Sequence, residues 1–252
     1  MTTIGFWTHA EQQPDRPAII DHDGTSLTYG ELNRRANRLA HGLQSQGLKA
    51  GDAVAVTLGN EPAFLEVALA AAQIGLYLTP INVRLTGPEM AHILDDCRAK
   101  VWIVGERVDA AARQAAADLV TSAPLLLAAG KAPGITPLDD LTDGQPDTPP
   151  AERTAGQVML YTSGTTGQPK GVRRPLPGVE PEAAARLTAG LAMLFGLTPG
   201  SGVHLVAAPL YTPPPWPSPR PPFTSGTPWC CSNGGTSWGP SSSSNGGRSR
   251  RR

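Results

Sequence analysis

The sequence predicts an α/β fold in which repeated βαβ units build a largely parallel sheet. Between Thr28 and Ala207, short apolar runs alternate with segments that repeat apolar residues at helical spacing. Turn and helix-start residues separate these segments at the lengths that parallel strands and their crossover helices need. The 252 residues are enough for a sizeable core in one or two domains.

Two helices are predicted from a capping box, in which Thr is followed three residues later by Glu. Thr28 and Glu31 form this pair ahead of one helix, and Thr86 and Glu89 form it ahead of another. The first box precedes an apolar stripe on one helical face, made of Leu32, Ala36, Leu39 and Leu43.

The other helices are predicted from proline and from the spacing of apolar residues. Asn60 with Pro62 predicts a helix start, because proline is favoured in the first helical turn. We expect an alanine-rich helix over 108–120 and a last helix over 181–195.

Strands are expected where short apolar runs lie between turn signals. These runs are 53–58, 77–81, 101–104, 125–127, 158–161 and 203–207. The Pro-, Asp- and Gly-rich segment 131–154 is expected to be a loop or linker rather than a core element. Ligands of such sheets gather beyond the carboxyl ends of the strands, which makes the segment after 158–161 a candidate site.

Composition favours an ordinary cytoplasmic protein. The 21 basic residues balance 21 acidic ones, and residues 212–252 hold five of the arginines and no acid, so the rest of the chain is mildly acidic. Three cysteines without disulfide or metal-ligand spacing favour a reducing compartment. The N-terminus lacks the pattern of a signal peptide. The most apolar window, 62–80, contains Glu66 and Gln73, so we expect it to be buried rather than to span a membrane.

The most informative motif is a run of hydroxyls and glycines that ends in a lysine. Residues 160–171 read Leu-Tyr-Thr-Ser-Gly-Thr-Thr-Gly-Gln-Pro-Lys-Gly. Glycines let backbone N–H groups converge on an anion, while hydroxyls and a lysine add donors and positive charge. These features predict a polyphosphate-binding loop. It is not a Walker A loop, because Lys170 lies between Pro169 and Gly171 instead of preceding Ser or Thr.

This string closely resembles the phosphate-binding signature of adenylate-forming enzymes, which include acyl-CoA synthetases, luciferases and the adenylation domains of peptide synthetases. Residues 27–32 and 79–96 resemble two further family stretches, and they occur in the family's order. Residues 209–211 resemble the start of another motif. The resemblance implies that residues 1–211 correspond to an incomplete N-terminal domain of the adenylate-forming fold.

The resemblance implies a two-step reaction of a carboxylic acid, with the fatty-acid branch as the expected subfamily. The carboxylate attacks the α-phosphate of ATP, and the thiol of coenzyme A then displaces AMP from the acyl-adenylate. The loop would hold the β- and γ-phosphates while Mg²⁺ neutralises their charge. The residues given this role are Thr162, Ser163, Gly164, Thr165, Thr166, Gly167 and Lys170.

The sequence also departs from the family pattern. Residues 172–175, Val-Arg-Arg-Pro, stand where many members place a Ser/Thr-His pair. The family's Tyr-Gly-x-Thr-Glu motif, ribose-binding Asp motif, hinge and C-terminal adenylation lysine have no counterpart in the 252 residues. We therefore expect this polypeptide to retain no catalytic residue, to bind ATP weakly at best and to be inactive.

The amino-acid composition of the chain changes abruptly at Thr212. Residues 212–252 are rich in Pro, Ser and Gly without periodicity, so we expect them to be disordered. Their five arginines, with tryptophans available for base stacking, offer a thin footprint for nucleic acid, and we do not expect binding there.

We interpret this change as a frameshift after Tyr211. Trp has the single codon TGG, so residues 228–231, Pro-Trp-Cys-Cys, can be read in the neighbouring frame as Leu, Met or Val, then Val, then Leu. The same shift lets residues 209–217 read Pro-Leu-Tyr-His-x-x-x-Leu-Ala, which resembles the continuation of the family motif. One lost nucleotide near Tyr211 explains both the altered composition and the stop.

Other candidate residues have simpler interpretations. The five histidines are scattered, so each is expected to be a surface or core residue rather than a metal ligand. Asp95 and Asp96 are expected to form a solvated helix face, and Tyr161 to pack at a strand end. A non-catalytic nucleotide-binding or interaction module is the alternative to a ligase, and a nucleic-acid-associated protein is a weaker third candidate.

Overall fold

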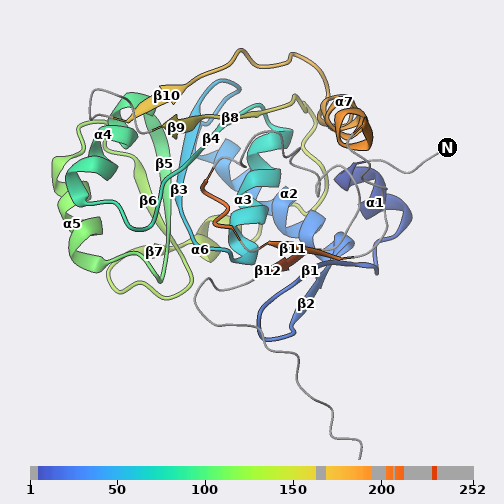
Figure 1. Cartoon of the computed structure of the whole chain (residues 1–252), viewed down its shortest axis with the longest axis horizontal. Coiled ribbons are helices and arrows are strands. Elements are labelled where there is room, and N and C mark those ends of the chain that lie inside the picture. The colour runs from blue at the N-terminus through green and yellow to red at the C-terminus, as the bar shows by residue number, and fades with distance from the viewer. Residues whose placement is uncertain (1–4, 163–168, 195–202, 207, 213–228, 232–252) are drawn as a thin grey trace, which may run out of the picture.

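A six-stranded parallel sheet organises the protein, in the order β7-β6-β5-β3-β4-β8 (Figure 1). Its strands are β3 (Ala53–Thr57), β4 (Tyr77–Pro80), β5 (Ala99–Gly105), β6 (Leu125–Ala129), β7 (Thr136–Pro137) and β8 (Gln157–Val158). The computed structural model describes residues 5–162, 169–194, 203–206, 208–212 and 229–231, with the backbone alone at 188–194 and 229–231. The α/β class predicted from the sequence is confirmed, with every neighbouring pair in this sheet parallel.

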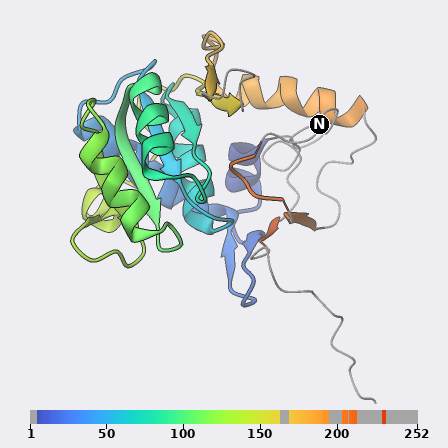
Figure 2. The ribbon, with the colours of Figure 1, turned by 60° about the vertical axis from the view of Figure 1, so that its left-hand side comes forward.

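Helices cover the two faces of this sheet and divide the core in two. Alternate residues of β3 point to opposite faces, as the strand pleat requires: Val54 and Val56 join one cluster, Ala53 and Ala55 the other. The first cluster lies under α2 (Tyr29–Ser45) and α3 (Pro62–Gln73). The second lies under α4 (Gly87–Cys97) and α5 (Ala110–Leu119), drawn in green in Figure 2.

Both predicted capping boxes are present. The Thr28 side chain accepts from the N–H of Glu31 at 3.2 Å, and the Glu31 carboxylate accepts from the N–H of Thr28 at 2.9 Å. The Glu89 carboxylate likewise accepts from the N–H of Thr86 at 2.8 Å. These hydrogen bonds lower the pKa of both glutamates, because they favour the ionised carboxylate.

The third predicted helix start is met in part. Pro62 is the first residue of α3, but the residue at the N-cap is Glu61. The amide of Asn60 instead donates to the carbonyls of Val206 (3.2 Å) and Ala208 (3.1 Å). Asn60 thus joins the start of α3 to the segment that follows β11 (His204–Val206).

A second sheet of four strands, ordered β11-β12-β1-β2, joins the N-terminal region to later parts of the chain. β1 (Pro17–Ile20) pairs antiparallel with β2 (Ser26–Thr28) and parallel with β12 (Trp229–Cys231), which pairs parallel with β11. Residues 212–252 were expected to be disordered; at 229–231 the backbone of β12 pairs on both sides, a strand that composition alone did not indicate. The rest of that prediction, from residue 213 on, falls outside the described residues.

Segment 131–154 is not only a loop. It contains β7 and a short helix, α6 (Leu138–Thr142), and both Leu138 and Leu141 are buried in the first core cluster. Two leucines three residues apart fall on one side of a single helical turn, which is enough to dock it against α2. One pair of leucines within a segment rich in Pro, Asp and Gly was too short a pattern to predict this helix.

The last described helix, α7 (Pro181–Leu194), lies beside α1 (Phe6–Gln12) at one end of the molecule (Figure 1). Arg153 connects them, because its guanidinium pairs with Glu182 of α7 and lies 4.9 Å from the ring centroid of Trp7. This contact brings together residues 29 and 146 positions apart in the chain.

Replacing Gly42 with alanine is expected to destabilise the fold, although alanine is the better helix former by about 1 kcal/mol. A Cβ at this position of α2 would lie 2.5 Å from the carbonyl oxygen of Leu141 and 2.9 Å from its Cγ. The overlap is with backbone, so α6 must shift, and we expect a net loss of about 1–3 kcal/mol in urea unfolding. Gln44→Ala, on the exposed side of the same helix, should change stability by less than about 0.5 kcal/mol. A Gly42→Ala variant more stable than the wild type would contradict this packing.

Candidate functional site

The two ends of the signature string form a pair of antiparallel strands, called the hairpin below. β9 (Leu160–Thr162) and β10 (Lys170–Val172) pair antiparallel, with Thr162 opposite Lys170. Both of these predicted site residues are exposed, at the ends of the strands where the connecting segment begins and ends. Ser163, Gly164, Thr165, Thr166 and Gly167 lie outside the described residues. The second strand, β10, was not predicted, because three residues are too few to show a strand period.

The hairpin continues directly from the parallel sheet. β8 pairs with the edge of β4, and the N–H of Met159 then donates to the carbonyl oxygen of Leu78 at 2.8 Å. The chain enters β9 at the next residue, so the hairpin lies beyond the carboxyl end of β8 (Figure 1). This end of the strands is where ligands bind in open α/β sheets.

Gly171, the last residue of the signature, is explained by packing inside the hairpin. A Cβ at this position would lie 2.5 Å from Cε of Met159 and 2.8 Å from Cζ of Tyr161. The absence of a side chain lets β10 lie close against these two residues. The glycine therefore has a structural reason that is independent of any ligand.

Two residues of α4 contact the hairpin. The Nε2 atom of His92 lies 3.1 Å from the carbonyl oxygen of Pro169, immediately before β10. The hydroxyl of Tyr161 in β9 donates to the carboxylate of Asp96. Burial, together with this hydrogen bond to the carboxylate, raises the pKa of the Tyr161 phenol above its ordinary value. Tyr161 therefore stays a neutral donor.

On the sheet side, Tyr77 contacts the chain that leaves β10. Its hydroxyl donates to the carbonyl oxygen of Arg174 at 2.7 Å, and its ring lies 4.2 Å from the guanidinium carbon of Arg173. That guanidinium also donates to the carbonyl oxygen of Gly51 at 2.6 Å. Both arginines belong to the segment 172–175, where the sequence was found to depart from the family pattern.

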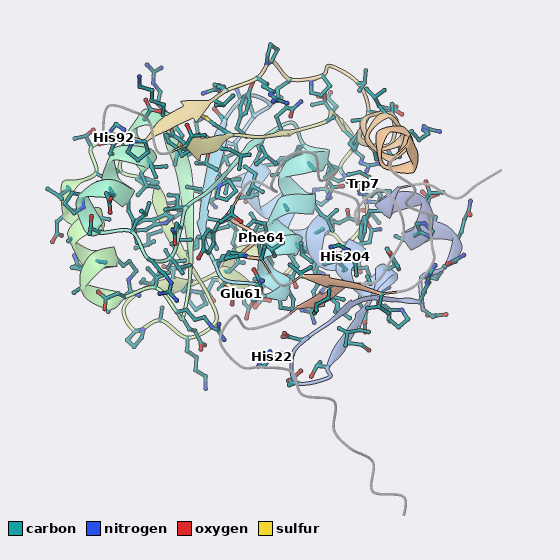
Figure 3. The ribbon with its side chains drawn as sticks, in the orientation of Figure 1. Trp7, His22, Glu61, Phe64, His92 and His204 are labelled. Atoms are coloured by element: carbon teal, nitrogen blue, oxygen red, sulfur yellow. The ribbon has the colours of Figure 1, made fainter. Side chains whose placement is uncertain are left out.

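The titratable residues of the described part of the chain offer no metal site. Figure 3 shows His22, His92 and His204 at separate positions, and no group of three or more His, Cys, Asp or Glu among the described residues could hold a metal ion. Burial raises the pKa of the Cys97 thiol to about 11, so this cysteine behaves as a core residue and not as a nucleophile. Among the described helices, none is both long and apolar enough to cross a membrane.

The described fold is a helix-covered parallel α/β sheet whose edge strand, β8, leads into the Thr/Ser/Gly signature. The chain belongs to the AMP-binding enzyme family, which it matches over residues 6–212. It corresponds to the N-terminal portion of adenylate-forming acid–CoA and acid–carrier-protein ligases.

Two curated relatives illustrate the similarity. A feruloyl-CoA synthase of Amycolatopsis is 40% identical over 171 residues, which cover 67% of this chain and 32% of the relative. The fatty acid–[acyl-carrier-protein] ligase ScoC of Streptomyces coeruleorubidus is 38% identical, with 65% and 31% covered. This chain thus spans about a third of the length of these two relatives.

Solved structures agree on the fold. The anthranilate CoA ligase AuaEII, in complex with anthranoyl-AMP, superposes with a TM-score of 0.75 at 22% identity, covering 90% of this chain and 44% of that one. A putative long-chain-fatty-acid CoA ligase of Rhodopseudomonas palustris gives a TM-score of 0.67 at 29% identity, covering 82% and 50%.

Proposed function

We propose that this chain supplies the ATP-phosphate-binding part of an ATP-dependent acid–thiol ligase. The observation that carries the proposal is the complete signature string at 160–171, whose described ends pair as β9 and β10 beyond the carboxyl end of β8. In the proposed reaction a carboxylate oxygen attacks the α-phosphorus of ATP, the bond to the β-phosphate breaks, and pyrophosphate leaves. The thiol sulfur of coenzyme A then attacks the acyl carbon, and AMP leaves as the thioester forms.

In this reaction the hairpin holds a positive charge and hydrogen-bond donors against the phosphates of ATP, and it exchanges no protons with the substrate. Lys170 supplies a cation to the β- and γ-phosphates, and Thr162 supplies a hydroxyl donor from the opposite strand. Ser163, Gly164, Thr165, Thr166 and Gly167 are proposed to add hydroxyl and backbone donors. Mg²⁺, carried by the phosphates of ATP, neutralises the remaining charge.

The acid substrate is proposed to be a fatty acid or a related carboxylic acid. The names of the relatives support a broad class, since they include a feruloyl-CoA synthase, a fatty acid ligase and a 3-hydroxybenzoate–CoA ligase. An enzyme carrying this segment should be assayed with ferulate, benzoate and fatty acids of graded length. Thioester formation from a fatty acid supports the proposed branch, and exclusive use of aromatic acids contradicts it.

For the 252-residue polypeptide we expect ATP binding without turnover. The adenine, ribose and adenylation-lysine motifs of the family do not occur in its sequence. Calorimetric titration with MgATP should detect weak binding, and trapping with hydroxylamine should detect no acyl-adenylate. Acyl hydroxamate above the level of a Lys170→Met control would contradict the inactivity, and absence of MgATP binding would contradict the phosphate-binding role.

A non-catalytic nucleotide-binding or interaction module is the alternative function. It is favoured by the same absence of motifs in the printed sequence, together with the intact signature. Binding of MgATP by the cellular form of the protein, without adenylate formation from any acid of the panel, supports this alternative over the ligase.

We further propose that the reading frame changes after Tyr211. The match to the family ends at residue 212, where the composition also changes. Sequencing the gene from source DNA tests this proposal. An extra nucleotide near codon 211, relative to the frame encoding this chain, supports it, and an unchanged frame through the codons for 228–231 contradicts it.

A further inference from the structure

The signature hairpin is too small to fix its own orientation. β9 and β10 contribute three residues each, and an isolated two-stranded hairpin is marginally stable at best in water. The direction in which Thr162 and Lys170 point must therefore be set by contacts with other elements. Those contacts come from α4 on one side and from β4 on the other.

One face of α4 contacts both strands of the hairpin. His92 and Asp96 are four residues apart, so they lie one above the other on the same helical face. His92 meets the chain at Pro169, before β10, and Asp96 accepts from Tyr161 in β9. The helix itself is anchored, because Met90, Ile93 and Leu94 are at most 2% exposed in the core.

On the sheet side, a buried residue of β4 holds the chain that follows β10. Tyr77 is 6% exposed in β4, and its hydroxyl contacts the backbone of Arg174, 97 residues later. Arg173 lies against the Tyr77 ring and reaches the carbonyl of Gly51. The chain leaving β10 is thus held by a cation–π contact and two hydrogen bonds to backbone carbonyls.

We infer that His92, Asp96 and Tyr77 are positioning residues that orient the two signature strands for phosphate binding. That this orientation serves phosphate binding rests on the proposed function, whereas the contacts that hold the hairpin are a property of the fold. These side chains act through Pro169, Tyr161 and Arg174. Losing one contact should loosen the hairpin and weaken phosphate binding while the rest of the sheet stays intact.

Hydrogen exchange of the full chain without nucleotide tests the support directly. The variants are Asp96→Ala, Tyr161→Phe, His92→Ala and Tyr77→Phe, each of which removes one contact. Peptides containing 160–162 and 169–172 should exchange about three- to tenfold faster, the change expected from one lost hydrogen bond. Peptides from β5 should be unchanged, which shows that the variants remain folded.

Two matched variants separate orientation from charge. Asp95→Ala removes an equal charge from the neighbouring position, whose carboxylate accepts from the backbone of Thr121 and Ser122 instead of from the hairpin. It should leave hairpin exchange unchanged. Asp96→Asn keeps an acceptor oxygen for Tyr161 and should restore most of the protection lost in Asp96→Ala.

A parallel MgATP titration distinguishes failure of this inference from failure of the proposed function. If the variants show faster hairpin exchange but neither they nor the wild type bind MgATP, the positioning role is supported and the phosphate-binding role is overturned. Wild-type hairpin exchange in both Asp96→Ala and His92→Ala overturns the inference, whatever the titration gives. Faster exchange together with weaker MgATP binding supports both.

Discussion

Replacing Trp102 with alanine is expected to lower the free energy of unfolding by about 3–5 kcal/mol. Trp102 is 1% exposed in the central strand β5, and it packs in the core cluster under α4 and α5. Such a loss is a large part of the roughly 5–15 kcal/mol that stabilises an ordinary domain. Urea unfolding followed by circular dichroism measures it, and a variant as stable as the wild type would contradict the packing described.

A second pair of variants separates the size of this side chain from its hydrogen bond. The indole N–H of Trp102 donates to Oγ1 of Thr57 at 2.8 Å, and Thr57 is fully buried in β3. Thr57→Val should cost about 1–3 kcal/mol, because it leaves a buried donor unpaired. Trp102→Phe with Thr57→Val removes both partners, so its loss should be smaller than the sum of the single losses.

The consequence of losing Trp102 should reach the candidate site. The core cluster that contains Trp102 also contains Met90, Ile93 and Leu94, which anchor α4. Because α4 contacts both strands of the signature hairpin, loosening this face of the sheet should loosen the hairpin as well. Faster exchange in 160–162 and 169–172 should therefore accompany the loss of stability in Trp102→Phe.

Replacing Lys170 with methionine is expected to weaken MgATP binding by about 10- to 100-fold, as the loss of one hydrogen bond to a charged group predicts. Lys170 is exposed, so the substitution should leave the unfolding midpoint unchanged. Lys170→Arg keeps the charge and should retain part of the affinity, although the guanidinium differs in shape and reach.

Lys131→Met is the matched control for Lys170→Met. Lys131 is also an exposed lysine, but it follows β6, and β5, β3 and β4 separate β6 from β8 in the sheet. Its loss changes the net charge equally and should not change MgATP affinity by more than about twofold, because screening limits effects over such distances. Equal weakening by both substitutions would mean that MgATP is attracted by overall charge and not by the hairpin.

Features written in a few neighbouring residues could be predicted from the sequence. The capping boxes at Thr28 and Thr86 are local hydrogen bonds between residues three apart, and both are present. The alternation of helices and parallel strands follows from apolar spacing and is confirmed. The signature string is likewise local, and it led to the family to which the chain belongs.

Features that depend on distant partners could not be predicted. The hydrogen bond between Tyr161 and Asp96 spans 65 positions, and the one between Tyr77 and Arg174 spans 97. No local sequence pattern predicts contacts between residues so far apart. Asp96 is exposed, as expected, and His92 is half-buried. Their contacts with the hairpin were not predicted, because they arise only when the fold brings one face of α4 against it.

Hydrogen exchange with and without MgATP tests the phosphate-binding role most directly. If the hairpin binds the phosphates of ATP, millimolar MgATP should slow exchange in peptides that contain 160–162 and 169–172. It should leave β5 and β6 unchanged, and the protection should disappear in Lys170→Met. Unchanged hairpin exchange in MgATP, or equal protection in the Lys170→Met variant, would contradict a phosphate-binding role for this segment.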